Sequence, residues 1–173
     1  DYRPLDRLED LLPVYAELLA ALTAVGAEWI QLDEPALVSE SIEIPRDAVL
    51  AATERAYELL GAVPIRPQIF VAAPYGSLDD ALPVLAGTPV EAIGLDLVKG
   101  SVPELVEGAL AAALASKTLV GGVIDGHNIW RGDLAGAFGP LEKLRALSPN
   151  VAVSSSQSLF PPPHDVDAAP LLG

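Results

Sequence analysis

Three short segments of this sequence carry polar side chains of the kinds that do chemistry. The first is Asp33-Glu34-Pro35, in which a carboxylate can hold the ammonium group of a substrate or act as a base. The alternative is that the two acids cap the following turn, with Pro35 fixing its shape. Asp33 and Glu34 are therefore candidate substrate-binding residues, and a structural turn is the competing interpretation.

The second segment reads Asp125-Gly126-His127-Asn128. An imidazole changes its charge near neutral pH and can act as a general acid, and the carboxylate two residues earlier can share its pocket. His127 is thus the candidate catalytic residue, with Asp125 and Asn128 as candidate substrate contacts. The alternative is a turn in which Gly126 takes an unusual backbone angle and Asn128 bonds locally, which leaves His127 on the rim.

The third candidate is Asp96, an isolated acid within the apolar segment 92–98. A buried carboxylate is costly unless it is paired. Lys99 is the nearest cation along the chain, so a structural ion pair is one expectation and a substrate contact is the other. Alternation places the two residues on opposite faces for as long as the strand continues.

Ligands for a metal ion are scarce in this sequence. It has no cysteine and two histidines, one of them His164 in a proline-rich stretch, whereas zinc takes about four N, S or O donors. No spacing of carboxylates indicates magnesium. The serine run 154–156 lacks a G-x-S-x-G setting. We therefore expect neither a metal site nor a nucleophilic serine.

Composition narrows the class of partner and the compartment. The 173 residues fit one domain and carry a formal charge of −14. Such a charge argues against binding to nucleic acid and against docking on anionic lipid. No apolar run approaches the roughly 20 residues that cross a bilayer. The lack of cysteine and of a signal peptide predicts a cytoplasmic protein. The absence of methionine, with Asp1 at the start, predicts a fragment.

Hydrophobic periodicity predicts the elements that must position these residues. Short β-rich runs alternate with amphipathic helices, which is typical of a parallel α/β sheet. The expected strands are 28–33, 67–73, 92–98, 118–125 and 150–155. The expected helices are 8–25, 45–60, 77–85 capped by Ser77, 101–114 with an S-x-x-E capping box, and 134–147.

Five parallel strands can form an open doubly wound sheet or the later part of a (β/α)8 TIM barrel. No dinucleotide or P-loop fingerprint appears, and polar residues at the carboxyl ends of strands suit either fold, with the barrel slightly favoured. We expect a partial barrel over residues 1–160 and a proline-rich extended tail over 161–173. A barrel takes about 250 residues, so the remainder of the barrel or a second copy should cover the two unpaired edges.

Three motifs resemble one known family. The segments WIQLDEPAL (29–37), LDLVKG (95–100) and GVIDGHNIW (122–130), with the preceding helix, are similar to the second half of the N-terminal barrel of cobalamin-independent methionine synthase. The resemblance covers most of residues 5–167. It implies a role in methyl transfer from a polyglutamylated methyl-tetrahydrofolate to homocysteine. It also implies a non-catalytic barrel that supports architecture and folate binding, with zinc only in the family's other, catalytic barrel.

The resemblance also assigns positions in the candidate site. The zinc ligands of the catalytic barrel, a His, a Cys, a Glu and a Cys, fall here at Ala72, Pro74, Asp96 and about Gln157. Of these only Asp96 could bind a metal, so this barrel should need no cofactor of its own. If the resemblance holds, the loops that carry these four positions open on the same side of the molecule.

Two further positions follow the catalytic barrel of that family. Asp33 corresponds to the acid that binds the amino group of homocysteine, and His127 to the proton-donating histidine. N-terminal barrels usually carry arginine at the latter position, so His127 departs from the closer pattern. That departure leaves a second hypothesis, a free-standing methyltransferase-like barrel using Asp33 and His127. An unrelated binding module is the third.

Overall fold

The computed structural model describes residues 3–104, 106–128 and 130–159. The proline-rich segment 161–173, with His164, lies outside the described residues, so the extended tail stays a prediction. None of the helices within the described ranges combines the length and the apolar character that a membrane span requires.

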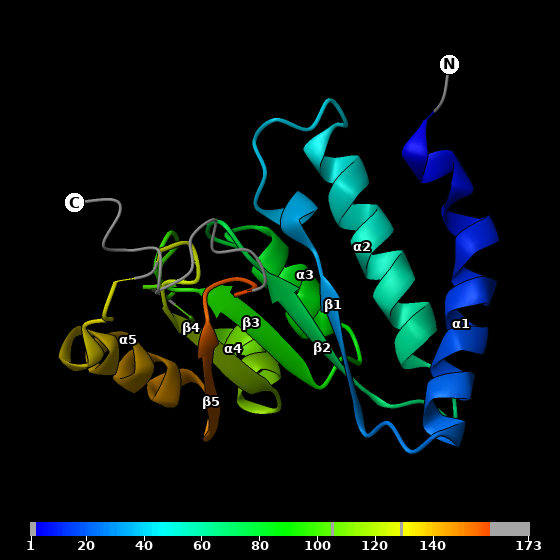
Figure 1. Cartoon of the computed structure of the whole chain (residues 1–173). Coiled ribbons are helices and arrows are strands. Elements are labelled where there is room, and N and C mark those ends of the chain that lie inside the picture. The colour runs from blue at the N-terminus through cyan, green and yellow to red at the C-terminus, as the bar shows by residue number, and fades with distance from the viewer. Residues whose placement is uncertain (1–2, 105, 129, 160–173) are drawn as a thin grey trace, which may run out of the picture.

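Helices and strands alternate along the chain in the predicted order (Figure 1). Both α5 and β5 have the predicted bounds, and the other strands differ from the predicted ranges by at most two residues at either end. The elements are η1 (Pro4–Arg7), α1 (Leu8–Ala24), β1 (Trp29–Asp33), η2 (Pro35–Leu37), α2 (Arg46–Gly61), β2 (Gln68–Ala73), α3 (Ala81–Gly87), β3 (Ala92–Asp96), α4 (Gly108–Ala115), β4 (Thr118–Ile124), α5 (Leu134–Leu147) and β5 (Asn150–Ser155).

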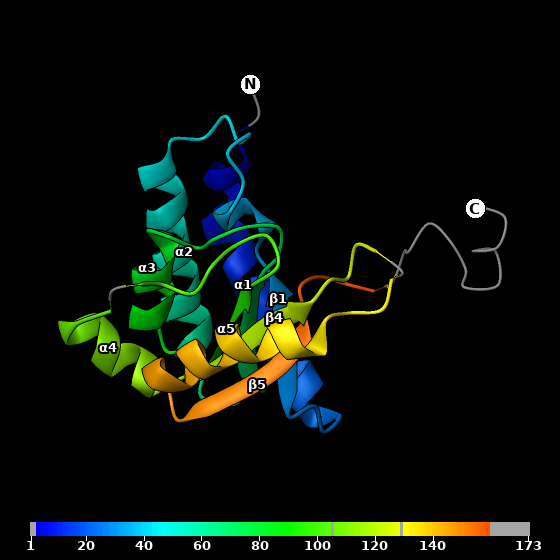
Figure 2. The ribbon, with the colours of Figure 1, turned by 90° about the vertical axis from the view of Figure 1, so that its left-hand side faces the viewer.

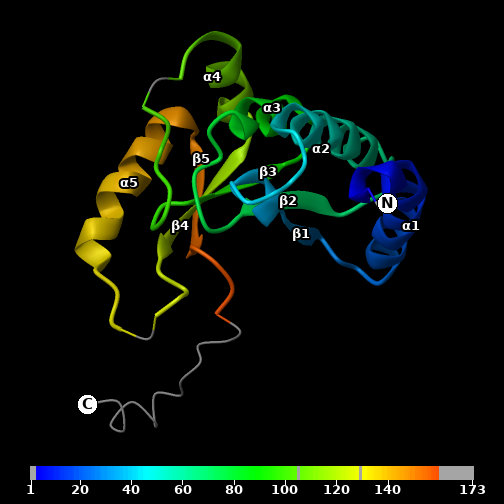
Figure 3. The same cartoon turned by 90° about the horizontal axis from the view of Figure 1, so that it is seen from above.

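Strand order decides between the two predicted folds. The described strands form one parallel sheet in the order β1-β2-β3-β4-β5, without a reversal. A doubly wound sheet reverses direction at its switch point. Right-handed crossovers that all step in one direction place every helix on the same face, and Figure 3 shows the helices as an arc outside the strands. The chain therefore forms five consecutive strands of a (β/α)8 barrel.

Alternate residues of each strand face the helices, and this face forms the core. Ile69, Val71, Ile93 and Leu119 are almost fully buried against helical residues such as Leu114. Each such side chain contributes roughly 1.5–3 kcal/mol on burial. Figure 2 shows α5 lying across β4 and β5 at one end of this layer.

The other face of the sheet belongs to the barrel interior. Parallel register aligns Gln31, Phe70, Ala92 and Thr118 across it. Gly94 leaves the space that the Phe70 ring fills, because a Cβ there would lie 2.9 Å from Cε2 of Phe70. The interior face therefore carries the rings of Phe70 and Trp29 beside small residues such as Gly94 and Ala92.

Two predicted helix starts are wrong. The helix expected from residue 101 begins at Gly108, and the helix expected from residue 77 begins at Ala81. Neither predicted cap forms, because the Ser77 hydroxyl accepts a hydrogen bond from the backbone N–H of Ser101 at 3.1 Å. This contact joins the loops that follow β2 and β3, and it replaces the local caps that the sequence favours.

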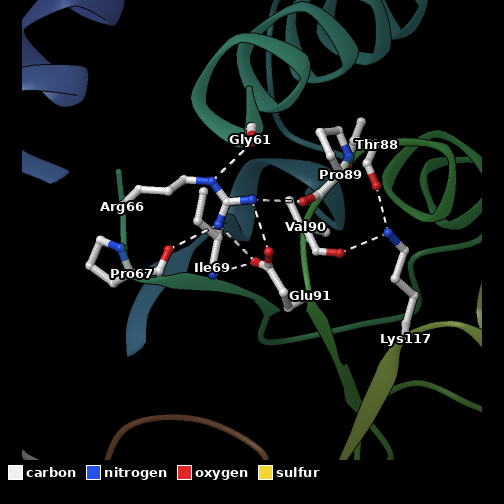
Figure 4. A network of polar contacts seen from close by, with 9 residues as sticks. All are labelled: Gly61, Arg66, Pro67, Ile69, Thr88, Pro89, Val90, Glu91 and Lys117. Atoms are coloured by element: carbon white, nitrogen blue, oxygen red, sulfur yellow. Dashed lines mark hydrogen bonds and ion pairs between the residues drawn. The ribbon is translucent and has the colours of Figure 1, made fainter. Parts of the chain in front are cut away.

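A polar network closes the opposite, amino-terminal end of the sheet (Figure 4). The Arg66 guanidinium binds both carboxylate oxygens of Glu91, with Nη2 to Oε1 at 2.8 Å and Nη1 to Oε2 at 3.0 Å. Ile69 donates its backbone N–H to the same carboxylate. The buried Lys117 ammonium donates to the carbonyls of Thr88 and Val90. Burial lowers the pKa of Lys117, while the charge of Glu91 opposes that shift.

Candidate functional site

A hollow of about 330 Å³ opens at the carboxyl ends of the strands. Its lining includes all four positions at which the family resemblance places zinc ligands: Ala72, Pro74, Asp96 and Gln157. The expectation that these loops open on the same side of the molecule is confirmed. The carboxyl ends of barrel strands are where barrel enzymes build their sites.

Asp33 lies in this hollow, as an exposed residue at the end of β1. Gln31 precedes it by two residues on the same face and donates from Nε2 to Oδ1 of Asp33 at 2.7 Å. Phe70 and Tyr75 line the same hollow. Asp33 therefore presents a carboxylate, held by an amide, in a hollow that two aromatic residues also line.

Glu34 points to the opposite side, toward the helices. Its carboxylate accepts a hydrogen bond from the buried Tyr57 hydroxyl of α2 at 2.5 Å, and its backbone N–H donates to Ala72. Burial raises the pKa of Glu34, the Tyr57 hydrogen bond opposes that shift and the Asp33 charge adds to it. Burial, together with Glu34, raises the pKa of the Tyr57 phenol. The two neighbouring acids of the first segment therefore face different environments.

Asp96 lines the hollow but is only 3% exposed. One carboxylate oxygen accepts the backbone N–H of Tyr75 at 2.8 Å, and the other accepts those of Val98 and Lys99 at 2.9 and 2.8 Å. The ion pair with the Lys99 side chain was a wrong prediction, because backbone amides of two loops satisfy this acid instead. Asp96 thus ties the loop after β2 to the loop after β3.

The loop after β4 holds the second predicted segment. The Asp125 carboxylate accepts hydrogen bonds from the backbone N–H of His127 and from the side-chain Nδ2 of Asn128. The side-chain Oδ1 of Asn128 accepts a hydrogen bond from the backbone N–H of Trp130. Asp125 and Asn128 line a neighbouring hollow, also of about 330 Å³. His127 is exposed and lines neither hollow. Asp33 and His127 are therefore not brought together in one pocket.

Gly126 serves this turn in a different way from the one predicted. It has no positive φ. Its constraint is steric, because a Cβ at this position would lie 2.6 Å from the Gln157 carbonyl oxygen. The turn with local hydrogen bonds forms as the alternative interpretation describes, while the roles of Asp125, His127 and Asn128 toward a ligand stay predictions.

The residues of the hollow that sequence reasoning missed include Gln31 and Tyr75. Gln31 carried a usable signal, since residues i and i+2 of a strand share a face and Gln31 pairs in that way with Asp33. Tyr75 carried none, because its position depends on a backbone conformation with φ +84° that no local pattern encodes.

The donors around the hollow do not fit zinc. The four family positions supply a methyl group, a proline ring, an amide and one carboxylate that already accepts three backbone N–H groups. Within the described part of the chain, no three His, Cys, Asp or Glu side chains gather where they could hold a metal ion.

Comparison with known proteins gives one consistent result. Residues 1–149 match the family model described as "Cobalamin-independent synthase, N-terminal domain". A 5-methyltetrahydropteroyltriglutamate–homocysteine methyltransferase of Streptomyces avermitilis is 48% identical over 168 residues, which cover 97% of this chain and 21% of that protein. Its counterpart in Rhodococcus jostii is 46% identical over 169 residues, covering 95% and 21%. The chain spans about a fifth of the length of these relatives.

A solved structure supports the fold. The B12-independent methionine synthase from Shewanella sp. W3-18-1, solved in complex with selenomethionine, superposes with a TM-score of 0.59 at 19% identity. The match covers 90% of this chain and 49% of that one. At this level of identity the likeness bears on the fold alone.

Proposed function

Because this chain belongs to the family of the N-terminal domain of cobalamin-independent synthase, we propose that it forms the later strands of the non-catalytic barrel in a 5-methyltetrahydropteroyltriglutamate–homocysteine methyltransferase. Its role in that protein is architectural, with help in placing the folate polyglutamate for a catalytic barrel that holds zinc and homocysteine. Homocysteine reacts through a free thiol, so the proposal places the protein in the reducing cytoplasm.

The state of Asp96 is the observation that supports this role most strongly. Asp96 occupies the one family ligand position that still carries a metal-binding side chain, and its carboxylate accepts three backbone N–H groups at 2.8–2.9 Å. A carboxylate bonded in this way fixes loops. Because Ala72, Pro74 and Gln157 supply no imidazole or thiolate, the hollow is suited to holding a shape rather than to activating a thiolate.

The proposed partner for the open side of the sheet is the remainder of the barrel. Leu11, Val14 and Leu18 of α1 are exposed at helical spacing, on a helix that packs on α2 through Leu12 and Leu19. Further βα units would cover this stripe and pair with the free edges of β1 and β5. A second copy of the chain is the alternative partner, and a size measurement of the purified chain separates the two.

The hypothesis of a free-standing methyltransferase that uses Asp33 and His127 gains no support from geometry. Asp33 lines the hollow at the strand ends, whereas His127 is exposed on the loop after β4. Acid–base catalysis requires both groups within reach of one substrate.

Metal content and methyl transfer test the proposal together. The chain is expressed with added zinc, its zinc is measured by plasma mass spectrometry, and transfer from 5-methyltetrahydropteroyltriglutamate to homocysteine is assayed. We expect far less than one zinc per chain and no transfer. Stoichiometric zinc that is lost in Asp96→Asn and kept in Asp79→Asn, a control acid that does not line the hollow, would overturn the proposal. Methyl transfer by this chain would overturn it as well.

A further inference from the structure

The sequence contains a single Asp-Gly pair, Asp125-Gly126, and it lies in the loop after β4. In such a pair the backbone nitrogen of the glycine can attack the side-chain carboxyl carbon of the aspartate. Glycine favours this attack, because it has no Cβ to crowd the nitrogen and it adopts a wide range of backbone angles. The two asparagines are followed by isoleucine and valine, whose branched side chains hinder the equivalent reaction.

The fold requires a glycine at position 126. A Cβ there would lie 2.6 Å from the carbonyl oxygen of Gln157, which follows β5. The N–H of Gly126 donates to the hydroxyl of Ser156, a buried residue of the same segment, at 3.3 Å. The close approach of two segments therefore places the reactive pair at this point of the loop, and no larger residue can replace the glycine without a shift of the backbone.

The carboxylate of Asp125 is held by its own loop. Its Oδ1 accepts the backbone N–H of His127 at 2.8 Å, and its Oδ2 accepts Nδ2 of Asn128 at 2.6 Å. Asn128 is fixed in turn, because its Oδ1 accepts the backbone N–H of Trp130 at 3.0 Å. Attack by the Gly126 nitrogen requires a carboxyl group that is free to rotate and to release one oxygen. Both hydrogen bonds oppose this while they persist.

We propose that Asp125-Gly126 is a site of spontaneous isoaspartate formation and that Asn128 slows the reaction in the folded chain. The Gly126 nitrogen forms a bond to the side-chain carbon of Asp125. One carboxyl oxygen leaves as water, with the amide proton and one proton from the medium. Water then opens the resulting ring at the backbone carbonyl and returns a proton. The chain now continues through the former side chain, and a free α-carboxylate remains. The change is an isomerisation that needs no oxidant or cofactor.

The product changes the loop that carries the predicted catalytic histidine. The former side-chain carbon of Asp125 becomes part of a peptide bond, so the present carboxylate no longer accepts the hydrogen bonds from His127 and Asn128. The backbone is also longer by one carbon atom at this point. The inference rests on the geometry of the loop and is independent of the proposed function.

The test compares the parent chain with Asn128→Ala, which removes one of the two hydrogen bonds to the Asp125 carboxylate. Both chains are incubated at neutral pH, and isoaspartate at residue 125 is quantified by electron-transfer mass spectrometry. We expect about fivefold more isoaspartate in Asn128→Ala, the factor that corresponds to a hydrogen bond of about 1 kcal/mol. Asp125→Glu, which keeps the charge, should form none, because its longer side chain closes the ring far more slowly.

Three controls separate loss of the hydrogen bond from loss of the fold. Asn150→Ala should behave like the parent chain, because Asn150 is exposed and begins β5 at the opposite end of the sheet from this loop. Circular dichroism follows the fold during incubation, and Asn128→Leu is a second variant that keeps the size of the side chain without its donor. In urea that unfolds both chains, the parent and Asn128→Ala should react equally fast.

The amount of isoaspartate at residue 125 decides the outcome. An equal or smaller amount in the folded Asn128 variants than in the folded parent would overturn the proposal. A difference of the same size in urea would overturn it as well, because the hydrogen bond from Asn128 belongs to the folded loop.

Discussion

Replacement of Glu91 by alanine should lower the free energy of unfolding by about 2–3 kcal/mol. Glu91 stands just before β3, where its carboxylate binds Arg66 through two hydrogen bonds and accepts the backbone N–H of Ile69 at 2.7 Å. The Arg66 side chain is 11% exposed and that of Glu91 is 33% exposed. The substitution therefore leaves a nearly buried guanidinium and a buried N–H without their acceptor.

Two features of the site set this magnitude. Loss of a fully buried ion-pair partner costs about 3–5 kcal/mol. Here the carboxylate is partly solvated, and Arg66 keeps the carbonyls of Gly61, Pro67 and Pro89 as acceptors, so the loss is smaller. Glu91→Gln keeps one oxygen that can accept from Ile69, but it loses the charge and leaves one Arg66 N–H facing an amide nitrogen, so the expected effect is about 1–2 kcal/mol.

Urea denaturation followed by circular dichroism measures the change, with the slope of the transition checked for constancy. Glu9→Ala is the control, because Glu9 forms a comparable pair with Arg55 on the open surface, where the side chains are 64% and 51% exposed. The control should show no measurable loss. If Glu91→Ala is as stable as Glu9→Ala, the network at the amino-terminal end of the sheet contributes nothing and this reasoning is refuted.

The same network predicts that the stability of the folded chain falls at acidic pH. Burial raises the pKa of Glu91, but the hydrogen bonds from Arg66 and Ile69 outweigh it and hold the pKa below its ordinary value of 4.5. A carboxyl with a lowered folded pKa contributes stability above its unfolded pKa and loses it as pH falls through the folded value. The parent chain should therefore lose stability below about pH 4.5 more steeply than Glu91→Gln.

The contribution of Glu34 to stability should depend on pH in the opposite direction, because burial raises its folded pKa above 4.5. That contribution is present below pH 4.5 and is lost as pH rises through the folded pKa. Glu34→Gln, which can still accept from Tyr57, should flatten this loss in a pH series of urea midpoints. Asp96→Asn should cost about 1–3 kcal/mol, because an amide nitrogen then faces a backbone donor; unchanged stability would contradict the hydrogen bonds assigned to Asp96. His127→Ala should stay within about 0.5 kcal/mol of the parent, as for an exposed loop residue; a loss of several kcal/mol would place the imidazole in the interior.

Much of the fold could be predicted from the sequence, because alternating β-rich and amphipathic segments depend on local patterns. The choice between barrel and open sheet could not, since strand order is a property of pairing between distant segments. The start of α4 was mispredicted for a related reason. Ser101 and Glu104 form a local capping signal, but the Ser101 N–H bonds to Ser77, 24 residues away.

The candidate site could also be predicted only where it depends on local sequence patterns. Asp33 and Asp96 could be placed in the hollow because both stand at carboxyl ends of predicted strands. The bonding of Asp96 could not be predicted, because one of its partners is the N–H of Tyr75, 21 residues earlier. Tyr75 also has a left-handed backbone, with φ +84°, which its local sequence does not indicate.

The missing histidine and cysteine ligands account for the poor fit to zinc, and the bonding of Asp96 adds to it. Both of its oxygens are bonded to backbone N–H groups of the loops after β2 and β3. These N–H groups occupy three of the roughly four lone-pair sites of the carboxylate, so about one is left for any further ligand. Zinc takes about four donors, and Asp96 could supply only one, because Ala72 and Pro74 have no metal-binding side chain.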